Sequence, residues 1–154
     1  HKSLPLNDTN IRFPNILGGN TPSYVFAGII SSDALNGSMS QCGTLFKRYN
    51  IKEFDLTLNG YSCNGFPITN IEKTPIDVYD KFLCTTKRKF KTQCPEQILP
   101  GDFSNFHFLF AHEFEGENTE NGWVGINIKL TEAYERNFTL GEYFYFFLIL
   151  YYNF

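Results

Sequence analysis

The stretch SYVFAGIISSDALNGS, residues 23–38, decides the fold class. Its first part, SYVFAGIIS at residues 23–31, is apolar in both alternating phases, which is typical of a β-strand covered on both faces. The strand then stops at a small polar segment containing Asn36-Gly37, a pair that tolerates positive φ angles in tight turns. The letters NGS also form an N-glycosylation sequon, so this segment is either a hard turn or a sugar acceptor. We expect the turn, with positive φ at both Asn36 and Gly37.

Composition favours a single all-β domain spanning residues 1–154. A chain of 154 residues that is 42% hydrophobic can bury roughly two-thirds of its unfolded surface in one core. Aromatic residues, which favour pleated and half-buried surfaces, make up 18% of the chain. A formal net charge of −3 gives no reason to expect a nucleic acid or an anionic membrane as a partner. The final apolar run, residues 143–152, is shorter than the ~20 residues of a membrane helix and is expected to be a strand.

Several other segments have the pattern of strands. LFKRYNIKEFDLTLNG, residues 45–60, reads as one long strand whose phase slips near Lys52-Glu53, which indicates a β-bulge. Asn59-Gly60 at its end predicts a type I′ hairpin turn. Two further segments, residues 106–114 and 123–130, alternate between apolar and other positions. The residues expected to face inward are Phe106, Phe108, Phe110, Phe114, Val124, Ile126, Ile128 and Leu130.

One segment changes to a helical period. In TPIDVYDKFLCTTK, residues 74–87, Thr74 is a candidate cap and Pro75 suits the first helical position. Its expected buried face consists of Ile76, Tyr79 and Leu83. Residues 87–102, with their prolines, read as a loop. We therefore predict an eight-stranded antiparallel jelly-roll sandwich with one short helix in a connection, with Greek-key connections as the alternative.

The chain has few candidates for chemistry. His107 and His112 are five residues apart on a predicted strand, so they point to opposite faces and do not share a metal. Glu113, Glu115 and Glu117 share a face, as glycosidase carboxylates would, but an acidic hairpin tip explains them better. No GxSxG nucleophile motif is present. We expect no catalytic, cofactor or metal site, and no enzyme.

Basic residues gather after the predicted helix, at Lys87, Arg88, Lys89 and Lys91. Such a cluster suits either a phosphate-binding or nuclear-localisation patch, or the solvated end of a helix, where cations interact favourably with the helix dipole. The helix end is the simpler interpretation, and we expect it.

Cysteines and sequons bear on the cellular compartment. Four cysteines are present, Cys42, Cys63, Cys84 and Cys94, and three sequons, at Asn7, Asn36 and Asn137. No CxxC pair occurs, so zinc spacing is absent. We expect reduced thiols, and two disulfides in a secreted glycoprotein are the alternative. The first ten residues lack an initiator Met and an apolar signal-peptide core, which suggests a piece or a processed form of a longer protein.

The order of these features resembles the second jelly roll of double-jelly-roll major capsid proteins, especially those of Polinton-type (Maverick) elements. Virophage and iridovirus-like capsid proteins are more loosely similar. The shared elements are an apolar strand with an Asn-Gly-Ser turn, an F-x-x-Y strand, an Asn-Gly hairpin and a following proline. They fall on Gly28, Ile29, Ile30, Ser32, Ala34, Asn36, Gly37, Ser38, Phe46, Tyr49, Asn50, Ile51, Leu56, Leu58, Asn59, Gly60 and Pro67. The resemblance covers about residues 11–154.

This resemblance implies a structural virion protein, a major capsid subunit or a fragment of one, without a catalytic site. Two rolls in tandem would form one subunit, and three subunits a pseudo-hexagonal capsomer assembled inside the host cell. The partners would be other copies and a companion roll, with no specific nucleic acid, membrane or small-molecule ligand. We expect the companion to cover the apolar strands at residues 24–30 and 143–152. The alternative is a secreted β-sandwich binding module, lectin-like or lipid-binding.

Overall fold

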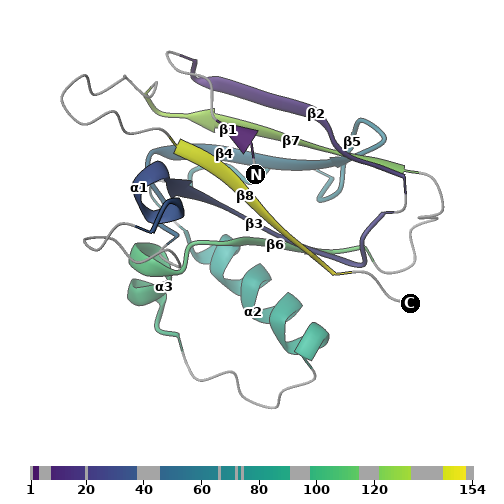
Figure 1. The fold of residues 1–154 in the computed structure, drawn as a ribbon. Helices are drawn as coiled ribbons and strands as arrows, with labels where there is room; N and C mark the ends of the chain where they lie inside the picture. The colour runs from purple at the N-terminus through teal and green to yellow at the C-terminus, as the bar shows by residue number, and fades with distance from the viewer. Residues whose placement is uncertain are drawn as a thin grey trace.

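Among the residues that the structure describes, β-strands make up most of the regular structure, and three helices lie in the connections (Figure 1). The computed structural model describes residues 2–3, 8–19, 21–37, 46–65, 67–71, 73, 75–90, 98–114, 122–132 and 144–151. The strands are β1 (Lys2–Ser3), β2 (Asn10–Gly19), β3 (Tyr24–Ser31), β4 (Ile51–Leu58), β5 (Tyr61–Ser62), β6 (Phe110–Glu113), β7 (Gly122–Leu130) and β8 (Phe144–Tyr151). The helices are α1 (Ser32–Leu35), α2 (Ile76–Phe90) and α3 (Pro100–Phe106).

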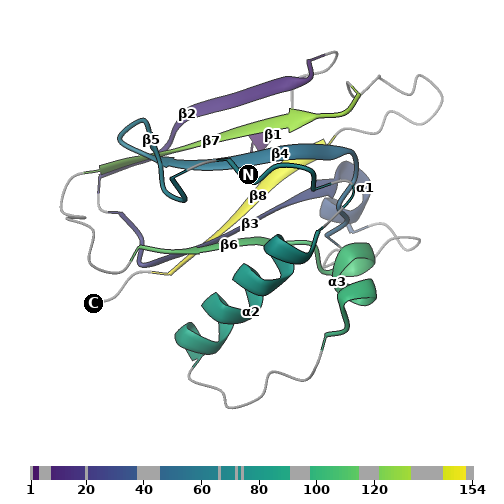
Figure 2. The same ribbon diagram turned by 180° about the vertical axis from the view of Figure 1, so that it is seen from behind.

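Two four-stranded sheets pack face to face, as a β-sandwich requires (Figures 1 and 2). The strand order is β1-β8-β3-β6 in one sheet and β2-β7-β4-β5 in the other. Every neighbouring pair of strands is antiparallel. The prediction of a single short helix was wrong, since α2 alone has 15 residues and α3 occupies part of the predicted loop.

The core lies between the inner faces of the two sheets. All eight residues of β3 are buried, which confirms the strand predicted at residues 23–31. The inward positions predicted for β7 are also confirmed, because Val124, Ile126, Ile128 and Leu130 are buried in the main core. Phe54 of β4 and Phe110 of β6 stack with their ring centroids 3.6 Å apart, which joins the two sheets. The core thus follows directly from the alternation of apolar residues.

The outer face of β3 is covered by the chain's own helices. Phe82 of α2 packs against Tyr24 and Phe26 of β3. Further along the strand, Ile30 packs with Ala34 of α1 and with Phe46. The expectation that a companion roll covers residues 24–30 is therefore wrong for this strand, because its two-sided burial is complete within one chain. The side chains of residues 144–148 and 151 lie outside the described residues.

The hairpin and bulge predicted around β4 are confirmed. Asn59 and Gly60 both have positive φ, 52° and 86°, and Leu58 pairs with Tyr61 across the turn. The register of β4 against β7 shifts between Ile51 and Glu53, at the predicted bulge. The strand begins only at Ile51, however, because Tyr49 adopts a left-handed conformation with φ 50°.

The edge strand β2 contains a second bulge. Its register against β7 shifts between Phe13 and Leu17, a segment that includes Pro14. Proline has no N–H to donate and is confined in sheets to edges and bulges. The bulge and the proline interrupt the edge of β2, which would otherwise present a regular row of hydrogen-bonding groups to other chains.

The segment after β3 is a helical turn, not the tight turn predicted from Asn36-Gly37. Ser31 caps α1, since its hydroxyl accepts a hydrogen bond from the Ala34 N–H at 3.3 Å. Asn36 has φ −83°, so the prediction of positive φ there was wrong, while Gly37 has φ 79° as predicted. The cap accounts for the difference, because it starts a helix whose last residues precede a left-handed glycine.

Helix α2 is longer than predicted, and its predicted buried face is correct only in part, since Tyr79 packs against the main core as expected. It continues through Lys87 to Phe90, where a loop was predicted. Val78 and Thr85 are buried, whereas Ile76 is 47% exposed. Phe106, expected to face inward, belongs to α3 and is 43% exposed. Thr74, the predicted cap, lies outside the described residues.

Candidate functional site

Helix α2 runs along β6, the edge strand of its sheet (Figures 1 and 2). Val78 reaches the main core, and Phe82 packs against Ala111 of β6. A helix laid over a strand edge protects its backbone groups from pairing with other chains. Beside these apolar contacts lies a group of ionisable side chains, Lys81, Arg88, His112 and Glu113, which we call the α2–β6 polar cluster.

Charged side chains attach the C-terminal end of α2 to the outer face of the sheet. Arg88 Nη1 lies 2.8 Å from Glu113 Oε2, and the Glu113 side chain is only 7% exposed. Lys89 Nζ lies 5.2 Å from the centre of the Tyr24 ring. Lys87, Arg88 and Lys89 occupy the last turn of α2, which confirms that the basic residues belong to a helix end, although this end lies inside the segment predicted as a loop. Lys91 lies outside the described residues.

His112 points to the opposite, inner side of β6. It pairs with Val25 of β3, and its ring packs edge-on against Phe114 at 4.7 Å between ring centres. Its Nε2 atom is buried and has no hydrogen-bond partner among the described residues. Burial, reinforced by the positive charge of Lys81 and opposed by Glu113, lowers the pKa of His112 to about 4. The imidazole is therefore neutral at neutral pH.

Lys81 connects α2 to the segment after β5. Its Nζ donates a hydrogen bond to Asn64 Oδ1 at 2.5 Å. Burial lowers the pKa of Lys81, and the charge of Asp77 opposes this shift. Sequence reasoning missed Lys81 and Asn64. A usable signal was that Lys81 lies three residues after Val78 and four before Thr85, beside the buried face of the helix.

A small cavity lies between the sheets beside His112. Its walls are Val25, Ala27, Phe54, Leu56, Asn64, Ile68, Phe110, Ala111 and His112. The space open to a water-sized sphere is about 10 Å³, which holds one water molecule at most. The cavity is therefore too small for an organic ligand.

The remaining predicted site residues do not form a reactive centre among the described residues. His107 is exposed at the end of α3, whereas His112 is half-buried on β6. Glu113 is paired with Arg88, while Glu115 and Glu117 lie outside the described residues. Within the described segments, no three His, Cys, Asp or Glu side chains come together in a way that would hold a metal ion.

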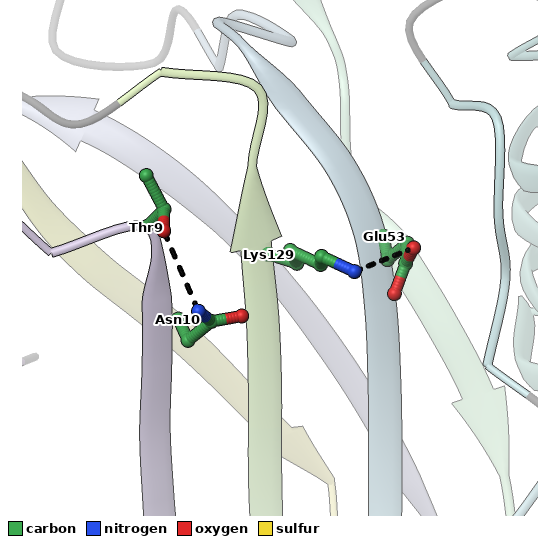
Figure 3. A network of polar contacts seen from close by, with 4 residues as sticks. All are labelled: Thr9, Asn10, Glu53 and Lys129. Carbon is green, nitrogen blue, oxygen red and sulfur yellow. Dashed lines mark hydrogen bonds and ion pairs between the residues drawn. The ribbon is translucent and has the colours of Figure 1, made fainter.

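Polar side chains lie on the outer face of the second sheet around Lys129 (Figure 3). Lys129 of β7 forms an ion pair with Glu53 of β4, with Nζ and Oε1 3.2 Å apart. On the neighbouring strand β2, Asn10 Nδ2 donates to Thr9 Oγ1 at 3.4 Å. Ion pairs as exposed as this one contribute little stability. This part of the face therefore has the character of a solvated surface.

Two features bear on the cellular compartment. Cys63 and Cys84 are thiols, and Cys42 and Cys94 lie outside the described residues. Asn36 is exposed, and the sequons at Asn7 and Asn137 lie outside the described residues. In the part of the chain that the structure describes, no helix has the length and apolarity to cross a membrane.

Comparison with known proteins adds no relative. A scan against protein-family models, a search of curated proteins and a search of solved structures each found no match to this chain.

Proposed function

We propose that this chain is a jelly-roll domain of a major capsid protein, a structural component of a virion. The resemblance described above suggests the C-terminal roll of a Polinton-type double-jelly-roll subunit. In this proposal the domain has no catalytic site, and it acts by self-association into trimers and then into a capsid lattice.

The strand pairing is the observation that carries the proposal. The first strand pairs with the eighth, the second with the seventh, the third with the sixth and the fourth with the fifth. Successive pairs alternate between the two sheets. This is the pattern expected if one long antiparallel hairpin is rolled up, which is how a jelly roll is built. Jelly rolls occur in viral capsids and also in lectins and cupins, so the pairing supports the architecture more specifically than the function.

The residues that carry the resemblance have structural roles, which supports treating them as one motif. A Cβ added to Gly28 would lie 2.7 Å from Phe46 Cδ1 and 2.8 Å from Leu109 Cδ2, so the strand needs a glycine there. Phe46, the first aromatic residue of the F-x-x-Y motif, thus packs directly on the Gly28 of the preceding motif. Asn59 and Gly60 form the hairpin turn. Distant parts of the motif therefore depend on one another.

Sedimentation velocity and light scattering test the assembly part of the proposal. The samples are this chain and the full-length protein encoded by its gene, each over a wide range of concentration. We expect the full-length protein to form trimers, and electron microscopy to show pseudo-hexagonal capsomers. A full-length protein that stays monomeric at every concentration would contradict the capsid function.

The secreted binding module remains the second candidate because the sequon residue Asn36 is exposed at the end of α1. Intact mass after expression in a eukaryotic secretion host distinguishes the two. A glycan lost in the Asn36→Gln variant, together with a mass deficit for two disulfides, would favour the secreted module. Four thiols in the folded protein favour the capsid domain, because capsids assemble in a reducing compartment.

A further inference from the structure

We propose that a polar groove on the outer face of the second sheet binds a neutral oligosaccharide. The groove has a volume of about 250 Å³ and lies over β2, β7 and β4. Six polar side chains line it: Asn10, Arg12, Glu53, Asp55, Asn127 and Lys129. The inference rests on this groove alone and does not depend on which of the two candidate functions holds.

One row of three side chains forms the centre of the proposed site. Asn127 of β7 pairs with Arg12 of β2 on one side and with Asp55 of β4 on the other. Neighbouring strands are about 4.8 Å apart, so the row spans roughly 10 Å of the face. Asn127 and Asp55 are half-buried, and Arg12 is exposed at the rim. The row therefore presents a guanidinium, an amide and a carboxylate on three adjacent strands.

A second row borders the first. Two residues further along β7, Lys129 pairs with Asn10 on one side and with Glu53 on the other (Figure 3). The ion pair between Lys129 and Glu53 occupies the charged groups of this row. The second row thus forms a polar wall for the groove, whereas the first row supplies the groups for a ligand.

The first row has hydrogen-bonding capacity to spare. Neither Arg12 nor Asn127 forms a hydrogen bond or ion pair with another described residue. Asp55 accepts a hydrogen bond from Ser62 Oγ through Oδ1, and its Oδ2 has no donor among the described residues. Guanidinium groups only donate, carboxylates only accept, and amides do both. A sugar hydroxyl also does both, so neighbouring hydroxyls of one ring match this row and replace the water there.

The charge of the groove selects a neutral ligand. The cations Arg12 and Lys129 are balanced by the carboxylates Glu53 and Asp55, so the formal charges cancel. A phosphate, a nucleic acid or a metal ion would therefore meet as many like charges as opposite ones. A protein partner is also disfavoured, because the centres of protein interfaces are depleted of charge. A polyhydroxylated, uncharged ligand uses both kinds of group without this penalty.

An exposed aromatic ring extends the proposed site along β7. Trp123 is 39% exposed and precedes Asn127 by four residues, so the two side chains share the outer face. At about 3.4 Å per residue they are roughly 13 Å apart along the strand. The apolar body of an indole suits the C–H face of a sugar ring. We therefore expect the site to prefer an oligosaccharide of several units over a single sugar.

Titration of isotope-labelled protein with neutral hexasaccharides, followed by NMR, tests the proposal. The probes are maltohexaose, cellohexaose, xylohexaose, mannohexaose and hexaacetylchitohexaose, with a heparin hexasaccharide as the charged comparison. We expect at least one neutral probe to shift the amide signals of residues 10–12, 53–55 and 127–129, with a Kd of about 0.1–1 mM. The fluorescence of Trp123, the single tryptophan, should change with the same Kd.

Two substitutions in the first row separate the groove from the rest of the surface. Arg12→Ala and Asn127→Ala should each raise the Kd by about 5–10-fold, because each removes a ligand hydrogen bond. Lys87→Ala is the matched control, since Lys87 is exposed in the last turn of α2, and it should leave the Kd unchanged. The amide spectrum of each variant shows in the same experiment that the fold is retained.

Three outcomes would overturn the proposal. One is that none of the five neutral probes shifts a signal in the groove. Another is binding of the heparin hexasaccharide alone, weakened by added salt, which would mean non-specific attraction of an anion. The third is an unchanged Kd in both Arg12→Ala and Asn127→Ala, which would place the bound sugar elsewhere on the surface.

Discussion

Replacing Gly125 by alanine should destabilise the domain, because this glycine makes room for the bulge in β2. Gly125 lies in the middle of β7, between β2 and β4. An added Cβ would lie 2.7 Å from Thr57 Oγ1, 2.8 Å from the Pro14 carbonyl oxygen and 3.1 Å from the Phe13 carbonyl oxygen. The threonine side chain can rotate away. The two carbonyl oxygens belong to the bulge and can move only with the backbone.

The magnitude follows from two opposing terms. Forcing an extra carbon into a packed site costs typically about 1–3 kcal/mol. Alanine also restricts the unfolded chain, which returns about 0.4–1 kcal/mol. We therefore expect a net loss of about 1–2 kcal/mol in the free energy of unfolding. In a domain of this size, that loss lowers the melting temperature by roughly 2–8 °C.

Urea and thermal unfolding followed by circular dichroism measure this loss. Gly101→Ala in α3 is the control, because no atom lies within 4 Å of its added Cβ and alanine favours a helix. It should be neutral or stabilising. In a Thr57→Ala background, Gly125→Ala should still be destabilising, since the carbonyl oxygens remain in place. If Gly125→Ala left the free energy of unfolding unchanged, the bulge would not depend on the glycine at this position.

Three further substitutions test other parts of the fold. Phe110→Ala removes the stack with Phe54 and should cost about 3–5 kcal/mol in urea unfolding; a loss below ~1 kcal/mol would mean that the two sheets are not joined there. Gly60→Ala places a side chain at φ 86° and 3.3 Å from the Trp123 ring, so we expect a loss of about 1–3 kcal/mol in thermal unfolding; a stabilised variant would contradict the described turn. Ser31→Ala removes the α1 cap and should cost about 1 kcal/mol, whereas Ser31→Thr keeps a hydroxyl acceptor and should lose less; equal losses in the two variants would show that the cap bond is unimportant.

The parts of the fold that were predicted correctly are those set by local pattern. The unbroken apolar run of β3, the alternation in β7 and the Asn59-Gly60 turn each determine a structure within a few residues. Asn36-Gly37 misled the prediction because the same two letters serve in a hairpin and at the end of a helix. The Ser31 hydroxyl, which caps α1, favours the helical turn over the hairpin turn in this segment.

The α2–β6 polar cluster was beyond the reach of sequence patterns. Arg88 and Glu113 are 25 residues apart, and only the packing of α2 on β6 brings them together. The prediction correctly assigned the basic residues to a helix end. It treated His112 as one of two equivalent histidines, although His112 is half-buried in a cavity wall and His107 is exposed.

The position of α2 also changes what the apolar β3 implies about partners. A strand buried on both faces suggested a second roll packed against it, but Phe82 and α1 already cover its outer face. The outer face of the other sheet carries the ion pair of Lys129 with the half-buried Glu53, and the centres of stable interfaces are depleted of charge. The proposed companion roll is therefore supported by the motif resemblance, while the jelly-roll architecture is supported by the strand pairing. A monomeric full-length protein would contradict the proposed companion roll and would leave the jelly-roll architecture unaffected.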